Sequence, residues 1–248
     1  MNNNEPATFW QHLDVLRWVI LRSLIVAAIF AVAAFVMKDR LFAVVLAPRT
    51  SDFITFQWLG VDPFSIHLMN TGLTEQFMTH MRVAMYVGLL CAAPYIIFEL
   101  FRFVSPGLYQ NERRGAIWIV SSGYLMFMMG ILLNYFLIFP LTVRFLGTYQ
   151  VSTEVENMLT LQSYTDTLIS MSLVMGVIFE LPIVCAILGK LGFLTSALMT
   201  RYRRHAIVAI LVVAAIITPT TDVFTLLVVS FPIWFLYEFS ILVVKLIR

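Results

Sequence analysis

Charged residues are scarce in this sequence. Only 12% of its 248 residues are Asp, Glu, Lys or Arg and 60% are hydrophobic, whereas soluble domains carry roughly 25% charged residues. The few charges lie in short clusters between long uncharged runs, although the helices of a soluble core need a polar face. The composition therefore excludes an ordinary soluble protein and indicates a membrane protein.

Cysteine and net charge are also low. The two cysteines, Cys91 and Cys185, lie within apolar runs, where cysteine usually acts as a small hydrophobe, so no disulfide framework is expected. The formal net charge is only +2, and no basic stretch is interleaved with aromatic residues. A nucleic-acid partner is therefore not expected.

Recognisable catalytic motifs are missing as well. No HExxH zinc-binding helix, GxSxG nucleophile elbow or GxxxxGK[ST] phosphate loop occurs. We therefore predict no enzymatic activity, no cofactor and no metal site. The N-terminus also lacks the basic segment of a cleavable signal peptide, so the first hydrophobic segment is expected to remain in the mature protein.

The sequence does contain a series of hydrophobic segments. A helix needs about 20 mostly apolar residues to cross a bilayer. Six segments are predicted to cross it: about 18–37, 77–101, 116–139, 167–189, 206–218 and 223–244. The fifth is short enough to be re-entrant, but that topology would separate the C-terminal Lys245 and Arg248 from the other basic residues.

With six crossings, most basic residues gather on one side of the membrane. That side holds both termini and the segments near 99–115 and 190–205, with Arg17, Arg22, Arg102, Arg113, Arg114, Lys190, Arg201, Arg203, Arg204, Lys245 and Arg248. The positive-inside rule assigns it to the cytoplasm. We predict an all-α membrane protein, one polytopic domain over 1–248, with short helices or caps in connections 38–76 and 143–166.

Two polar segments lie on the predicted cytoplasmic side. Residues 8–17 predict an amphipathic interfacial helix, on which Asp14 and Arg17 could simply pair with each other. Between the second and third spans, Pro106-Gly107 predicts a turn, after which a restarted helix would present Glu112 at the surface. Neutralisation of Glu112 by the arginines that follow it is the alternative.

An acidic residue also lies inside the fourth span. Glu180, two residues before Pro182, is expected to face protein or water, because a carboxylate in hydrocarbon is costly and usually functional. A structural hydrogen bond to a neighbouring helix is the alternative. Before the sixth span, Thr221 or Asp222 is a candidate N-cap. Near the far end of the same span, Glu238 could simply snorkel towards the interface.

Prolines at or within the spans are expected to kink the helices; besides Pro182 they are Pro48, Pro94, Pro140 and Pro232.

Taken in chain order, these motifs form a recognisable series. His-Leu-x-x-Leu-Arg precedes the first span and Ala47-Pro48 follows it, Ala93-Pro94 lies in the second, and Phe-x-x-Pro-Gly-Leu-Tyr-x-x-Glu-Arg-Arg precedes the third. Phe-Glu-x-Pro lies in the fourth span, and Thr-Pro-x-x-Asp-Val-Phe precedes the sixth. Together they resemble the TatC family, the signal-peptide receptors of the twin-arginine protein translocase.

The resemblance implies a kinked, concave, glove-like bundle of six transmembrane helices in the bacterial cytoplasmic (inner) membrane. It implies a receptor that binds twin-arginine signal peptides of folded cargo and recruits single-span partners of the TatA and TatB type. It also implies self-association in the complex and transport driven by the proton-motive force.

The resemblance also implies roles for individual residues. Glu112 matches the acid that binds the arginine pair, and guanidinium groups do prefer carboxylate partners. The same peptide site is expected to include Asp14, Arg17, Phe103, Pro106 and Leu108, although Val15 stands where many relatives have glutamate. Glu180 matches an intramembrane acid, and Thr218, Pro219 and Asp222 match a region that contacts partner subunits. Leu226 belongs to the same expected contact region but lies where some relatives carry a polar residue.

Two other classes of function stay open at this point. A proton-coupled small-solute transporter could use Glu180 as its titrating group, with Pro94 and Pro182 interrupting its helices, but no inverted repeat is evident. A structural membrane scaffold is the other, and it would show no arginine-dependent peptide binding.

Overall fold

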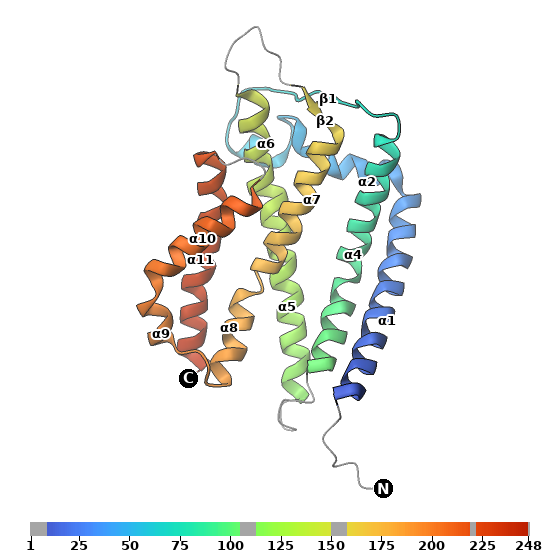
Figure 1. The fold of residues 1–248 in the computed structure, drawn as a ribbon. Coiled ribbons are helices and arrows are strands. Elements are labelled where there is room, and N and C mark those ends of the chain that lie inside the picture. Colours follow the sequence, from blue (N-terminus) through green and yellow to red (C-terminus); the bar gives the residue numbers. More distant parts are fainter. Residues whose placement is uncertain (1–8, 105–112, 150–157, 219–221, 248) are drawn as a thin grey trace. The chain divides into compact units, whose positions relative to one another are not determined.

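Helices make up nearly all the regular structure of this protein. The structure, a computed structural model, describes residues 9–104, 113–149, 158–218 and 222–247. Its helices and strands, labelled in Figure 1, are α1 (Phe9–Val36), α2 (Lys38–Val45), α3 (Ile54–Trp58), β1 (Leu68–Met69), α4 (Glu75–Val104), α5 (Arg113–Leu133), α6 (Phe139–Thr148), β2 (Leu159–Thr160), α7 (Leu161–Ile178), α8 (Leu181–Lys190), α9 (Ser196–Arg201), α10 (Arg203–Ile217) and α11 (Val223–Ile247).

Several helical stretches are long and apolar enough to cross a membrane. Within the described residues there are five: Leu13–Val36, Glu75–Leu100, Ser121–Thr148, Leu161–Lys190 and Val223–Ile247. They correspond to five of the six predicted spans and confirm the expected membrane protein. The fifth predicted span coincides with α10, whose 15 residues make it shorter than the others. The six-span count therefore stays a prediction.

The chain folds as two compact units, which we describe separately. The first comprises Met1–Leu41 and His80–Tyr124. Within it, α1 and α4 meet where a Cβ at Gly88 would lie only 2.5 Å from the backbone nitrogen of Ala31, so glycine permits the approach. The rings of Phe35 and His80 stack nearby with centroids 4.1 Å apart. Most large apolar side chains of α1 are exposed, as expected for a lipid-facing helix.

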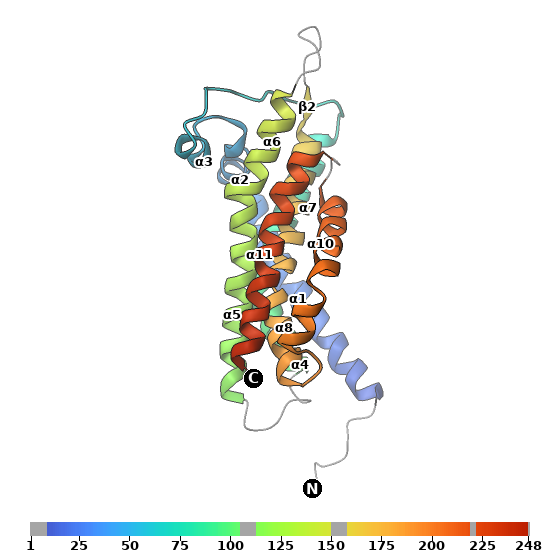
Figure 2. The ribbon, with the colours of Figure 1, turned by 90° about the vertical axis from the view of Figure 1, so that its left-hand side faces the viewer.

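The second unit comprises Phe42–Thr79 and Leu125–Arg248. In it α11 runs beside α8 and α10, as both views show (Figures 1 and 2). The most deeply buried side chains include Ile138, Phe139, Met171, Met175 and Val229, which come from the third, fourth and sixth predicted spans. These residues belong to the apolar core of the second unit.

The connection between α1 and α4 contains short elements, as predicted. Besides α2 and α3 it holds a 3-10 turn over Ala47–Arg49 and the strand β1, which pairs in parallel with β2. Glu75 joins these parts: its carboxylate accepts hydrogen bonds from the backbone N–H groups of Thr71 (3.0 Å), Gly72 (2.9 Å) and Gln162 (3.2 Å). The all-α prediction missed this strand pair, because two-residue strands have no readable periodicity.

The prolines occupy different helical positions. Pro48 is buried in the 3-10 turn, and Pro182 is the second residue of α8, just after the break that ends α7 at Ile178. By contrast, α4 continues through Pro94 and α11 through Pro232. A π-helical segment, Asn134–Ile138, leads into α6 and was not predicted. The kinks predicted at Pro94 and Pro232 stay predictions.

Candidate functional site

Only part of the predicted peptide site can be placed. Glu112, Pro106 and Leu108 lie outside the described residues. Asp14 and Arg17 are exposed on α1, and Phe103 is half-buried near the end of α4. No ion pair joins Asp14 and Arg17, whose side chains are both described, so the pairing considered from the sequence is not seen.

The same end of α4 carries a buried acid that sequence analysis missed. Glu99 is only 4% exposed, and its Oε1 accepts a hydrogen bond from the Tyr95 hydroxyl at 3.2 Å. The guanidinium of the exposed Arg102 lies 4.0 Å from the same oxygen. The signal was available, because Tyr, Glu and Arg at positions i−4, i and i+3 share one helix face.

Glu180 lies at the break between α7 and α8. Its backbone N–H donates to the Val177 carbonyl (3.1 Å), while its carbonyl accepts from Ile183 and Val184 (both 3.0 Å). One carboxylate oxygen, Oε1, is buried and has no hydrogen-bond partner among the described residues. A buried polar atom without a partner is costly, and such atoms gather at functional positions.

The predicted partner-subunit residues flank the step from α10 to α11. Thr218 ends α10 and is buried, and its hydroxyl finds no partner within the described parts of the chain. Asp222 caps α11 by accepting a hydrogen bond from the Thr225 N–H at 2.7 Å, which confirms the predicted N-cap. Leu226 is half-buried one turn later, and Pro219 lies outside the described residues.

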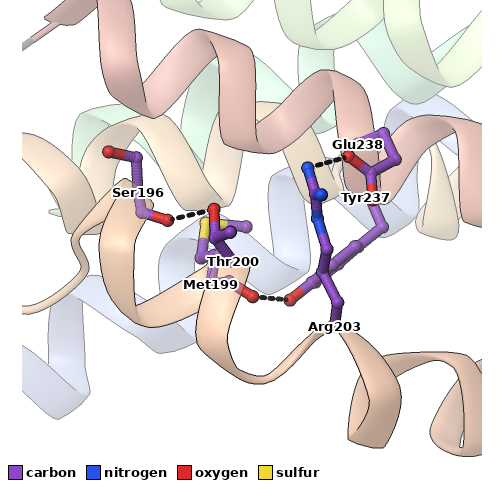
Figure 3. A network of polar contacts seen from close by, with 6 residues as sticks. All are labelled: Ser196, Met199, Thr200, Arg203, Tyr237 and Glu238. Carbon is purple, nitrogen blue, oxygen red and sulfur yellow. Dashed lines mark hydrogen bonds and ion pairs between the residues drawn. The ribbon is translucent and has the colours of Figure 1, made fainter.

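A polar network ties α9, α10 and α11 together (Figure 3). Arg203 at the start of α10 donates to the Glu238 carboxylate of α11 at 2.7 Å, and the Tyr237 hydroxyl donates to the Met199 carbonyl at 2.8 Å. Glu238 therefore has an ion-pair partner on α10, and its snorkelling towards the interface stays a prediction. Sequence analysis treated Arg203 only as part of a basic cluster.

The candidate residues of the two units include carboxylates near helix ends and at a helix break, and none of those described belongs to a cluster suited to a metal. In the ranges that the structure covers, no group of three or more His, Cys, Asp or Glu side chains comes together. Cys91 and Cys185 are free thiols, as predicted from their apolar surroundings. Carboxylates near a membrane surface can bind cationic groups, above all guanidinium groups, through charge-assisted hydrogen bonds.

Comparison with known proteins gives a consistent result. The family model described as "Sec-independent protein translocase protein (TatC)" matches residues 11–232. Among curated proteins, the TatC protein of Carboxydothermus hydrogenoformans is 30% identical over 245 residues, which cover 99% of this chain and 96% of that one. The TatC protein of Deinococcus radiodurans is 32% identical, with coverages of 98% and 87%.

The fold is similar to a solved structure as well. A crystal structure described as that of the twin arginine translocase receptor TatC matches with a TM-score of 0.77 and 30% sequence identity. The match covers 95% of this chain and 99% of that one. Sequence and fold therefore agree over nearly the full length of the chain.

Proposed function

The chain belongs to the TatC family of Sec-independent protein translocase proteins, and from this premise we propose that it is the receptor subunit of a twin-arginine translocation system. It binds twin-arginine signal peptides of folded proteins at the cytoplasmic face of the bacterial inner membrane. The observation that carries the proposal is the full-length likeness to the twin arginine translocase receptor TatC. Family membership favours this function over the small-solute transporter and the scaffold.

The binding chemistry rests on acids within a basic surface. In this proposal Glu112 and Asp14 together bind the arginine pair. The rest of the peptide site is formed by Arg17, Phe103, Pro106 and Leu108. Asp14 is exposed and has no ion-pair partner among the described residues, which leaves its carboxylate available. Arginine is preferred over lysine, because its planar guanidinium pairs with a carboxylate through two hydrogen bonds.

The rest of the proposal concerns topology and partners. The chain forms one membrane domain of six spans with both termini in the cytoplasm, which the distribution of basic residues supports. Single-span TatA-type and TatB-type subunits contact the step around Thr218, Pro219, Asp222 and Leu226, and copies of the chain associate in the complex. The buried hydroxyl of Thr218 supports such a contact, because it lacks a partner within the described residues.

Glu180 is proposed as an intramembrane functional acid during transport driven by the proton-motive force. The helix break and the unpartnered Oε1 atom, judged over the described residues, support this role. No catalytic step is proposed, and the protein acts by binding and assembly.

A peptide-binding experiment tests the receptor function. Purified protein is titrated with a fluorescent twin-arginine signal peptide and with the matched twin-lysine peptide. We expect Glu112→Gln and Glu112→Ala to weaken twin-arginine binding roughly 10- to 100-fold, since a hydrogen bond to a charged group is worth about 1.5–3 kcal/mol. The twin-lysine peptide should bind weakly to every variant.

The matched control neutralises an acid outside the proposed site. Asp62→Asn removes a carboxylate from the connection between α3 and β1, which the proposed topology puts on the opposite side of the membrane. This variant should bind the twin-arginine peptide like the unchanged protein. Unaltered arginine-dependent binding by Glu112→Ala would remove Glu112 from the site, and equal binding of both peptides would count against the receptor function.

A further inference from the structure

The short helix α3 leaves an apolar face uncovered in the connection between α1 and α4. Trp58 is 84% exposed, the adjacent Leu59 54% and Ile54, one turn earlier, 47%. The other face of α3 is packed, because Thr55 and Phe56 are buried. A connecting segment in water would normally expose polar side chains at such positions.

Contacts with a membrane-spanning helix fix the position of α3. The ring of Phe53, which precedes α3, lies 5.4 Å from the Tyr135 ring and 5.8 Å from the Phe136 ring. The Thr55 hydroxyl donates a hydrogen bond to the Phe136 carbonyl. The Tyr135 hydroxyl in turn donates to the Val44 carbonyl of α2 at 2.7 Å. Thus α3 lies at the level of residues 135 and 136 of the π-helical segment.

The charges of α7 and α8 show where this level lies in the bilayer. Asp166 and Lys190 mark the polar ends of this span, and the 23 residues between them measure at most about 34 Å at 1.5 Å per residue, enough for the roughly 30 Å of a hydrocarbon core. Tyr164, just outside Asp166, packs against Phe139 with ring centroids 5.0 Å apart. Phe139 therefore lies at the headgroup level.

Phe136 lies three residues from Phe139 towards the hydrocarbon, a distance of about 4.5 Å along the helix. It is 42% exposed although it contacts Phe53, so this side of the helix faces lipid. Since α3 packs beside a lipid-facing residue at the edge of the hydrocarbon, its uncovered face meets the same lipid.

From this placement we propose that α3 is an interfacial anchor, whose Ile54, Trp58 and Leu59 side chains insert between the phospholipid headgroups of the adjacent leaflet. Tryptophan suits this region, because its ring is apolar and its N–H can still hydrogen-bond to headgroups or water. The polar Gln57 amide instead donates to the Asp52 carbonyl at 2.7 Å. The inference needs the chain to span the membrane and is independent of its role as a receptor.

Depth-dependent fluorescence quenching tests the anchor. Trp10, Trp18, Trp118 and Trp234 are replaced by Phe, so that Trp58 is the only indole, and the protein is placed in phosphatidylcholine vesicles. The lipids carry bromine either near the glycerol end or near the methyl end of the acyl chains. We expect greater loss of Trp58 fluorescence with the shallow bromines than with the deep ones, and weak quenching by aqueous iodide.

A second single-tryptophan protein is the matched control. It keeps Trp234, the twelfth of the 25 residues of α11, and deep bromines should quench it more strongly. Should the multiple replacements disturb folding, Trp58→Phe alone must remove a shallow-quenched component from the unchanged protein. Quenching of Trp58 by iodide alone would show that water covers this face of α3. Quenching by neither iodide nor bromine would show that protein covers it. Stronger quenching by deep bromines than by shallow ones would place Trp58 in the hydrocarbon. Each of these three results overturns the proposal.

Discussion

At Gly130 of α5, the absence of a side chain lets α5 and α7 pack closely. A Cβ there would lie 2.5 Å from the Met175 carbonyl oxygen and 2.9 Å from the Phe179 ring. The main obstacle is backbone, which cannot move aside as a side chain can. In a bilayer, helix association depends on such close packing rather than on hydrophobic burial, so this contact should matter for stability.

We expect Gly130→Ala to destabilise the protein by about 1–3 kcal/mol, the usual cost of overpacking. Thermal unfolding in detergent, followed by the reactivity of a thiol dye or by aggregation, should show a clear drop in the midpoint temperature. Gly176→Ala should cost less, because its new Cβ would meet the Phe127 ring, which can rotate. Ser121→Ala on the exposed side of α5 should be neutral. Equal midpoints for Gly130→Ala and Ser121→Ala would contradict the packing argument.

Individual residues differ in how far the sequence reveals them. Asp222 could be predicted as a cap, because capping depends on residue type and a local position before an apolar run. Glu238 could not be assigned, since its partner Arg203 is 35 residues away and nothing local links them. Glu99 was missed for a different reason. Its partners Tyr95 and Arg102 are local in sequence, but it lies within an apolar run, and that run predicted only a membrane-spanning helix.

Among the helices, α9, α10 and α11 meet at one junction, where two short helices pack against the last long one. It combines an ion pair, a tyrosine hydrogen bond and an apolar cluster of Met199, Ile241 and Val244. The Arg203 and Glu238 side chains are 47% and 27% exposed, and pairs of this kind contribute only about 0–1 kcal/mol. The hydrogen bond of Tyr237 is part-buried and satisfies a carbonyl near the end of α9.

We therefore expect Tyr237→Phe to lower stability by about 0.5–1.5 kcal/mol, the usual net value of a hydrogen bond. Glu238→Gln should cost less and should lose its effect at high salt, because salt screens exposed charges. Thermal unfolding in detergent at low and high ionic strength measures both. Tyr202→Phe is the control, since Tyr202 is exposed and its hydroxyl makes no hydrogen bond within the described residues. A larger loss from Glu238→Gln than from Tyr237→Phe would reverse this ranking.

Element by element, the sequence predicts long helices well and short elements poorly. Spans one to four and six were found from apolar length, because lipid forces an uninterrupted helix of sufficient length. The break between α7 and α8 follows the local Glu180-Leu181-Pro182 sequence, since proline favours the first turn of a helix. The π-helical segment and the β1–β2 pair depend on contacts between distant residues, so no local pattern indicated them.

At the scale of the whole molecule, the length of α10 decides the topology. Its 15 residues measure about 22 Å, shorter than the roughly 30 Å hydrocarbon core. If α10 still crosses the membrane, the local bilayer must thin or neighbouring polar residues must snorkel, at a modest cost. If it does not cross, α11 runs in the opposite direction and the C-terminal Lys245 and Arg248 leave the cytoplasm, against the positive-inside rule.

Cysteine labelling of spheroplasts separates these two topologies. After Cys91 and Cys185 are replaced by Ala, single cysteines are placed at the exposed positions Leu246, Thr200 and Asp62. A membrane-impermeant maleimide added to spheroplasts should label Asp62→Cys directly, whereas Thr200→Cys should react only after the membrane is permeabilised. With six spans, Leu246→Cys behaves like Thr200→Cys, because an even number of crossings returns the chain to its starting side. Labelling of Leu246→Cys in intact spheroplasts, with Thr200→Cys still protected, would instead mean that α10 does not cross and that the chain has five spans.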